Sequence, residues 1–128
     1  MLRPSGRLVA IEPDWDTFII DPGDGETVRK FFHFCNDQFP DGSTGRKLRR
    51  YFAERNLRNV TIHPESLVMH DLESVFRLMN MEQFISSATE NGVIPQEEID
   101  LWQNEMKRAD EKNQFTFAGM IFVVSGQK

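Results

Sequence analysis

The stretch LRPSGRLVAIEP, Leu2–Pro13, decides the fold that this sequence predicts. Pro4-Ser5-Gly6 is a turn signal, and the apolar run Leu8–Ile11 follows it closely. A short apolar run after a turn is typical of a strand that is covered on both faces, as in a parallel sheet. Proline cannot donate a hydrogen bond to a neighbouring strand, so we expect the strand to end at Glu12-Pro13-Asp14.

The early position of this strand predicts that the chain belongs to a larger domain. A strand as apolar as Leu8–Ile11 needs a neighbour on its edge, yet it begins almost at the start of the chain. We therefore expect the C-terminal piece of a larger α/β domain, with an open edge along Arg7–Glu12. Because an open edge invites pairing, we also expect a homodimer, joined across this strand or by exchange of elements, or else a missing N-terminal half.

Further along the chain, apolar periodicity predicts the order strand, helix, helix, strand, helix, helix, strand. Apolar residues that recur every three or four positions indicate helices, and short apolar runs between turns indicate strands. Pro64 within the second strand indicates an edge position or a bulge. The last run, Phe115–Ser125, is apolar on both faces and is therefore expected to be an interior strand. The four helices are expected near residues 28–39, 44–56, 71–92 and 95–112.

Composition limits the classes of function. The 128 residues fit one domain, and a net charge of −5 argues against a general nucleic-acid binder, which usually needs a basic face. We interpret the basic run Arg46–Arg50 as a solvated helix face. No signal peptide is visible, and no apolar run approaches the roughly 20 residues of a membrane helix. We therefore expect a cytoplasmic protein that binds neither nucleic acid nor a membrane.

The sequence lacks the usual constellations of catalytic and metal-binding residues. Cys35 is the only cysteine, and together with three histidines it falls short of the ligand set of a structural zinc site. It also lies on the apolar face of a predicted helix, where cysteine is usually a packing residue. Gly23-Asp24-Gly25 is the only Gly-x-Gly, but no apolar strand leads directly into it, so we interpret it as a turn that starts a helix. We predict no metal site, and no catalytic residue can be assigned.

The best candidates for a binding site follow the first strand. The carboxyl end of this strand carries three carboxylates, those of Glu12, Asp14 and Asp16. Open α/β sheets bind their ligands at this end of their strands. Trp15 and Phe18 would add a flat apolar wall, which suits a small-molecule pocket. A polar loop that carries a buried tryptophan explains the same residues, and the sequence leaves both interpretations open.

The segment Leu2–Pro13 resembles a motif of the class I S-adenosylmethionine-dependent methyltransferases, L-[KR]-P-G-G-x-L-hydrophobic-x-x-[ED]-[PT], with Ser5 in place of the first Gly of the pair. In that family the segment is the turn and fifth strand of a seven-stranded, Rossmann-like sheet. Leu57–Ile62 resembles the sixth strand, with Asn56 in place of a Gly, and Phe115–Val124 resembles the seventh. The three segments occur in the family's order and cover nearly the whole chain.

The resemblance implies a sheet whose last strand runs antiparallel between the first and the middle strand. It also implies one partial domain over residues 1–128, in which the helices at about 71–112 are an insertion that covers the substrate. The family's cofactor residues lie on its first four strands, and nothing here matches them, so we expect this chain alone not to bind S-adenosylmethionine. The pocket of a small-molecule methyl acceptor would be lined by Glu12, Asp14, Trp15 and Phe18.

Two functions are therefore open. In the first, the chain is the C-terminal portion of a small-molecule methyltransferase and supplies the substrate-side elements. In the second, it is a non-catalytic α/β binding or dimerisation module derived from that fold. A Gly-rich cofactor motif directly upstream, in the same reading frame, would favour the first function.

Overall fold

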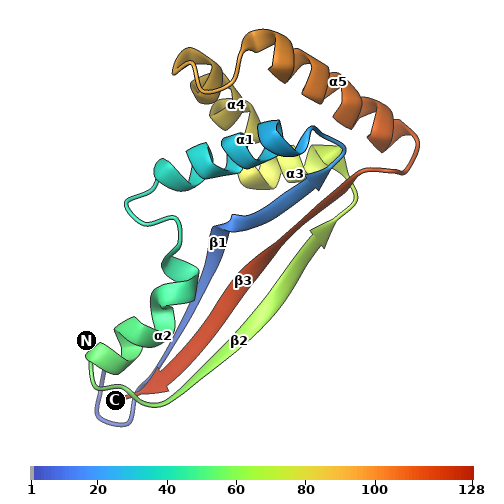
Figure 1. The fold of residues 1–128 in the computed structure, drawn as a ribbon. Coiled ribbons are helices and arrows are strands. Elements are labelled where there is room, and N and C mark those ends of the chain that lie inside the picture. The colour runs from blue at the N-terminus through green and yellow to red at the C-terminus, as the bar shows by residue number, and fades with distance from the viewer. Residues whose placement is uncertain (1) are drawn as a thin grey trace.

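Three long strands form the centre of the molecule (Figure 1), a computed structural model that describes residues 2–128. The last strand lies between the other two and runs antiparallel to both, which confirms the predicted order first-last-middle in an α/β fold. The elements in chain order are β1 (Arg7–Asp21), α1 (Gly25–Asp37), α2 (Thr44–Glu54), β2 (Arg58–Met69), α3 (Leu72–Met79), α4 (Met81–Glu90), α5 (Gln96–Glu111) and β3 (Thr116–Gln127).

The helices form two groups at opposite ends of the sheet (Figure 1). α2 lies at the end that holds both termini, and the other four helices gather at the far end. Each group packs against a different face of β3. One strand can serve both groups because alternate residues of a strand point to opposite sides. Phe122 and Val124 pack with α2 on what we call the Val124 face, whereas Phe117 packs under the other helices on what we call the Phe117 face.

β1 corrects the expectation for the first strand. It runs over 15 residues to Asp21 and does not end at Glu12-Pro13-Asp14. Proline is tolerated there because β1 is an edge strand, which pairs on one side only. The prediction of a strand buried in a parallel sheet was also wrong, since β1 is antiparallel to β3 and its side chains Val9 and Ile11 are 52% and 62% exposed.

The third predicted helix, residues 71–92, is two helices in the structure, which makes five helices and not about four. Asp71 caps α3 by accepting a hydrogen bond from the backbone N–H of Ser74 at 2.9 Å. Asn80 takes the left-handed conformation, with φ 52° and ψ 43°, and ends α3 before α4 begins. The apolar positions continue on both sides of Asn80, so periodicity alone hides the break.

The main core lies between the Phe117 face and the helices α1, α3, α4 and α5. Phe31 on α1 meets Trp102 on α5 edge-on, with 5.2 Å between ring centroids. The indole N–H of Trp102 also donates to the carbonyl of Pro22 at 3.0 Å, which ties α5 to the turn after β1. Cys35 is fully buried in this core, and its burial raises the pKa of the thiol to about 12, so the residue is a packing group at neutral pH.

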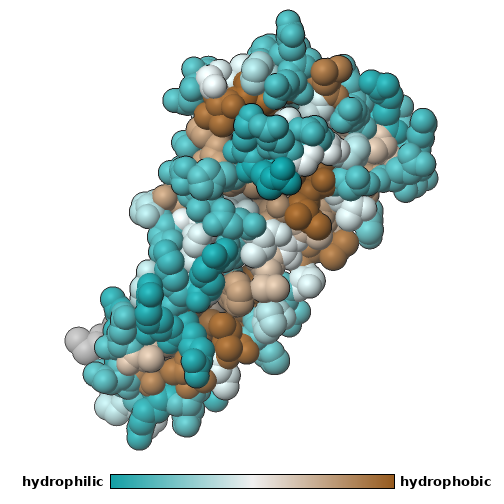
Figure 2. Space-filling model, viewed as in Figure 1, coloured by the Kyte–Doolittle hydropathy of each residue, from teal (hydrophilic) through white to brown (hydrophobic). Residues whose placement is uncertain are grey.

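Each group of helices leaves half of one sheet face uncovered. On the Val124 face the exposed apolar side chains include Ile19 and Val68, and on the Phe117 face they include Val9 and Ile11. Figure 2 shows apolar surface over the strands, between the two groups of helices. None of the helices in residues 2–128 combines the length and the apolar character needed to cross a bilayer.

Candidate ligand-binding groove

A bulge in β1 sets the geometry of the candidate site. The register of β1 against β3 shifts after Asp14, and residues 15–18 lie opposite Gly119 alone. Thr17 holds the bulge, because its hydroxyl donates to the carbonyl of Asp14 at 2.7 Å and accepts from the backbone N–H of Met120 at 2.9 Å. The predicted loop after the first strand is therefore an irregular part of the strand itself.

The bulge turns two aromatic residues toward the same core. Trp15 and Phe18 are both buried on the Phe117 face, with 5.2 Å between their ring centroids, although a regular strand would point them to opposite sides. Phe18 lies directly over Gly119, where an added Cβ would come within 1.7 Å of its ring. The backbone N–H of Trp15 donates to the carbonyl of Gly42 at 3.3 Å, so the loop between α1 and α2 covers this part of the β1 edge.

An ion pair removes Asp14 from the set of predicted site residues. The side chain of Asp14 is only 1% exposed, and Arg46 on α2 binds it through both Nε and Nη2, the latter at 2.8 Å from Oδ1. The backbone N–H of Asp16 donates to the same Oδ1 at 3.2 Å. Asp14 therefore anchors α2 to β1, and Arg46, the first residue of the basic run, is a partner of this pair and not merely part of a solvated face.

An apolar groove of about 400 Å³ opens beside the bulge. Ile11, Pro13 and Ile121 form its floor on the Phe117 face, and Leu78 and Phe84 come from the end of α3 and from α4. Its remaining lining is also apolar, apart from the side chain of the left-handed residue between α3 and α4. A concave, mostly apolar cavity of this size is typical of a small-molecule site.

One wall of the groove is aromatic. The Trp15 ring stacks on Phe39, with 5.1 Å between centroids and 28° between planes, and it meets Phe84 edge-on at 5.4 Å. Phe39 was expected on the apolar face of the first helix, but it lies two residues beyond the end of α1 and is partly exposed. The three rings together give the groove an apolar aromatic wall.

A second hollow shares the lining residues Pro13, Trp15 and Phe39 with the groove. Glu12 and Asp41 are its acidic lining residues. Asp41 accepts hydrogen bonds from Lys47 at 2.8 Å and from the Tyr51 hydroxyl at 3.1 Å, and the Lys47 bond lowers the pKa of Asp41 below its usual value. The carboxylate of Glu12, in contrast, makes no ion pair or hydrogen bond with side chains of residues 2–128.

The structure thus brings together three of the four predicted site residues. Trp15 and Phe18 line the groove, and Glu12 lines the hollow beside it. Sequence reasoning missed the contributions of Leu78 and Phe84, because apolar residues at helical spacing carry no signal that distinguishes a groove from a core. Within residues 2–128, no group of three or more His, Cys, Asp or Glu side chains is placed to hold a metal ion.

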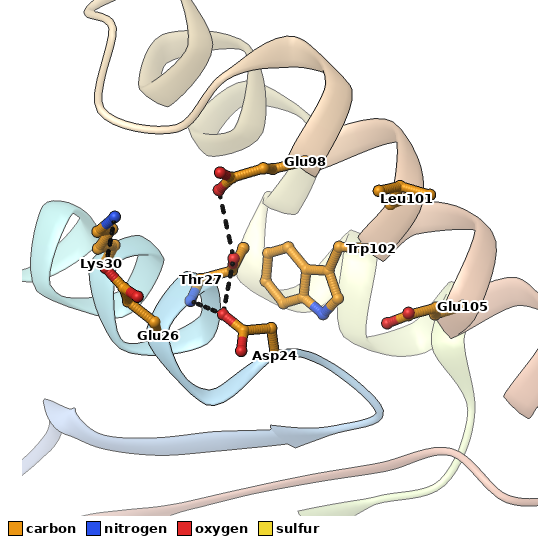
Figure 3. Close-up of a pocket in the computed structure, with 8 residues that line it drawn as sticks. All are labelled: Asp24, Glu26, Thr27, Lys30, Glu98, Leu101, Trp102 and Glu105. Carbon is orange, nitrogen blue, oxygen red and sulfur yellow. Dashed lines mark hydrogen bonds and ion pairs between the residues drawn. The ribbon is translucent and has the colours of Figure 1, made fainter.

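A third cavity, of about 340 Å³, lies between α1 and α5 (Figure 3). Its polar groups bind one another: Asp24 accepts from the backbone N–H of Thr27 at 3.0 Å, and the Thr27 hydroxyl lies 3.5 Å from a carboxylate oxygen of Glu98. Asp24 thus caps α1, which confirms the interpretation of residues 23–25 as a turn that starts a helix. We assign this cavity a structural role in joining α5 to α1.

Comparison with known proteins identifies a relative but no family. No family model matches the chain. The chain is 29% identical, over 128 residues, to the "Uncharacterized 37.1 kDa protein in transposon TN4556" of Streptomyces fradiae. This alignment covers 99% of the chain but only 36% of the Streptomyces protein, so the chain spans about a third of that relative's length.

Proposed function

We propose that the chain is the substrate-side, C-terminal portion of an S-adenosylmethionine-dependent methyltransferase that acts on a small molecule. The observation that carries this proposal is the strand order, in which β3 runs antiparallel between the parallel strands β1 and β2. It is the order that the methyltransferase-like segment Leu2–Pro13 implies. The helices α3 and α4 between β2 and β3 add support, because they border the groove on the face where an insertion would cover a substrate.

The groove fits the methyl acceptor and not the methyl donor. S-adenosylmethionine supplies a methyl group on a positively charged sulfur, and its amino and carboxylate groups need polar partners that an apolar groove does not offer. The residues of this chain would hold the acceptor against the apolar wall that includes Trp15 and Phe84 and exclude water from it. Methyl transfer is an in-line displacement that depends mainly on positioning, so an apolar site without a catalytic acid or base is chemically sufficient for a reactive acceptor.

A chimera with the Streptomyces relative tests this function. We expect that relative, and a chimera in which this chain replaces the matching third, to bind S-adenosylmethionine and to transfer its labelled methyl group to small molecules. The isolated chain should bind neither this cofactor nor S-adenosylhomocysteine. Calorimetry measures the binding, and the recovery of label in an organic extract measures the transfer. An intact relative that binds neither compound would contradict the proposal, and so would micromolar binding of the cofactor by the isolated chain.

The alternative function, a non-catalytic dimerisation module, is favoured by one observation. The loop between α1 and α2 covers the edge of β1 at Trp15, but the stretch Arg7–Glu12 remains an unpaired edge with exposed apolar side chains. Such an edge can pair with the same edge of a second copy and form one continuous sheet.

Val9→Lys tests the dimer. Val9 is 52% exposed on β1, and Val68, on the opposite edge strand β2, is 51% exposed, so Val68→Lys is a matched control. We expect light scattering to show a dimer for the unmodified chain and for Val68→Lys, and a monomer for Val9→Lys, because an edge lysine disfavours strand pairing. A monomeric unmodified chain at high concentration would rule out this interface.

A further inference from the structure

We propose that Asn80 is the specificity-determining residue of the groove, and that its side-chain amide accepts a hydrogen bond from an O–H or N–H group of the bound molecule. The inference rests on the function proposed above, because it names the class of methyl acceptor, an apolar molecule that carries a hydrogen-bond donor. Residues of this chain form the groove, so binding alone tests the inference without methyl transfer.

Asn80 supplies the only side-chain oxygen among the residues that line the groove. The other polar side-chain group in the lining is the indole N–H of Trp15, which can donate a hydrogen bond but cannot accept one. In a mostly apolar site, a small number of polar groups fixes the orientation of the ligand. A donor group that enters the groove loses its bound water, so it favours the position where Asn80 accepts its hydrogen bond.

The local backbone leaves the amide of Asn80 free for this role. Asn80 directly precedes α4, where the side-chain oxygen of an asparagine commonly accepts a hydrogen bond from the first turn of the helix. Such a cap needs an extended backbone, but Asn80 is left-handed and makes no capping bond. Its Nδ2 donates to Oε1 of Gln83 at 2.6 Å, whereas its Oδ1 accepts no hydrogen bond from residues 2–128.

A purely structural role would explain the backbone of Asn80 but not its amide. Asparagine tolerates the left-handed conformation that ends α3 at this position. Glycine adopts the same conformation without strain, so Asn80→Gly removes the amide and keeps the break between the helices. Asn113 provides a matched control, because it is also exposed, is left-handed with φ 56° and does not line the groove.

Two competitors of nearly the same size isolate the hydrogen bond. 2-Naphthol carries one O–H donor, and 2-fluoronaphthalene has a fluorine in its place. Each is used to displace N-phenyl-1-naphthylamine, a neutral dye that becomes fluorescent in apolar sites, and the displacement gives the two dissociation constants. We expect Asn80→Gly to shift the ratio of these constants against 2-naphthol roughly threefold to tenfold, as for the loss of one hydrogen bond, and Asn113→Gly to leave the ratio within about twofold.

Asn80→Asp identifies which atom of the amide makes the contact. Aspartate also tolerates the left-handed conformation, and an ionised carboxylate accepts hydrogen bonds but has no N–H to donate. We therefore expect this variant to keep the ratio of the unmodified chain, or to favour 2-naphthol further. Circular dichroism should show that all three variants keep the fold.

Four results would overturn the proposal: no saturable displacement of the dye by 2-naphthol, an unchanged ratio in Asn80→Gly, the same shift in both glycine variants, or a loss of the 2-naphthol preference in Asn80→Asp. The proposed methyltransferase function has a separate outcome. If the competitors behave as expected while the chimera fails to bind S-adenosylmethionine, Asn80 remains a ligand contact and the methyl transfer is rejected.

Discussion

Arg46→Met is expected to lower the free energy of unfolding by about 3–5 kcal/mol, because it leaves a buried carboxylate without its countercharge. Asp14 is 1% exposed, whereas the side chain of Arg46 is 49% exposed, so nearly all of the desolvation falls on the acid. Methionine keeps much of the apolar stem that packs against β1, which confines the change to the charge. Urea unfolding followed by circular dichroism measures the loss.

Asp14→Asn and the double variant identify the cause of this loss of stability. Asp14→Asn should cost less than Arg46→Met, since the guanidinium that it leaves unpaired is half exposed and close to Asp16, 3.8 Å away. The double variant with Asp14→Asn and Arg46→Met removes both charges and should recover a large part of the loss, as replaced buried ion pairs often do. If the double variant is as unstable as the sum of the single ones, the buried charge is not the cause.

This ion pair also links stability to the candidate site. It fixes α2 against the start of the bulge, and the loop before α2 supplies the carbonyl of Gly42 that binds the backbone of Trp15. A chain that loses the pair should therefore bind a neutral apolar dye such as N-phenyl-1-naphthylamine more weakly even where it remains folded, because the Trp15 ring is a wall of the groove.

The strand order could be predicted from the sequence, but the course of β1 could not. Phe115–Ser125 is apolar at consecutive positions, which only an interior strand requires, and Pro64 assigns its neighbour to an edge. Pro13 carries the same edge signal, but next to charged residues it was interpreted as the end of a strand. A proline can lie within a strand when no other strand pairs with it on the side of its nitrogen. The local sequence does not show whether such a neighbour is present.

The groove illustrates the same limit at the level of the site. Trp15 and Phe18 could be chosen from the sequence as an apolar wall, because they lie at the end of the predicted first strand, where open α/β sheets bind their ligands. The ion pair of Asp14 could not be predicted, since its partner Arg46 lies 32 residues away on α2. The spacing of Trp15 and Phe18 suits opposite faces of a regular strand, and they share a core only because of the bulge.

Gly119 is the residue that permits this bulge, and Gly119→Ala is expected to cost about 2–3 kcal/mol, near the upper end of the usual effect of overpacking a core. An added Cβ would come within 1.7 Å and 2.2 Å of two ring atoms of Phe18, which is itself 4% exposed and has no free space to enter. Gly25→Ala is the control, because there the nearest atom, at 3.2 Å, is the mobile end of Arg29.

A second substitution shows whether the Phe18 ring causes the loss of stability expected for Gly119→Ala. Phe18→Ala removes the ring atoms that an alanine at position 119 would meet, so the double variant should be more stable than the sum of the two single effects predicts. If the two losses in the free energy of unfolding, measured in urea, are strictly additive, Gly119 acts through its backbone and not through the Phe18 contact. If the contact is the cause, the strain is located at the bulge that also positions Trp15. Gly119→Ala should then weaken binding of the neutral dye N-phenyl-1-naphthylamine, while Gly25→Ala should not. A glycine in the middle of an apolar strand is then a further local sign of the groove, beside Trp15 and Phe18.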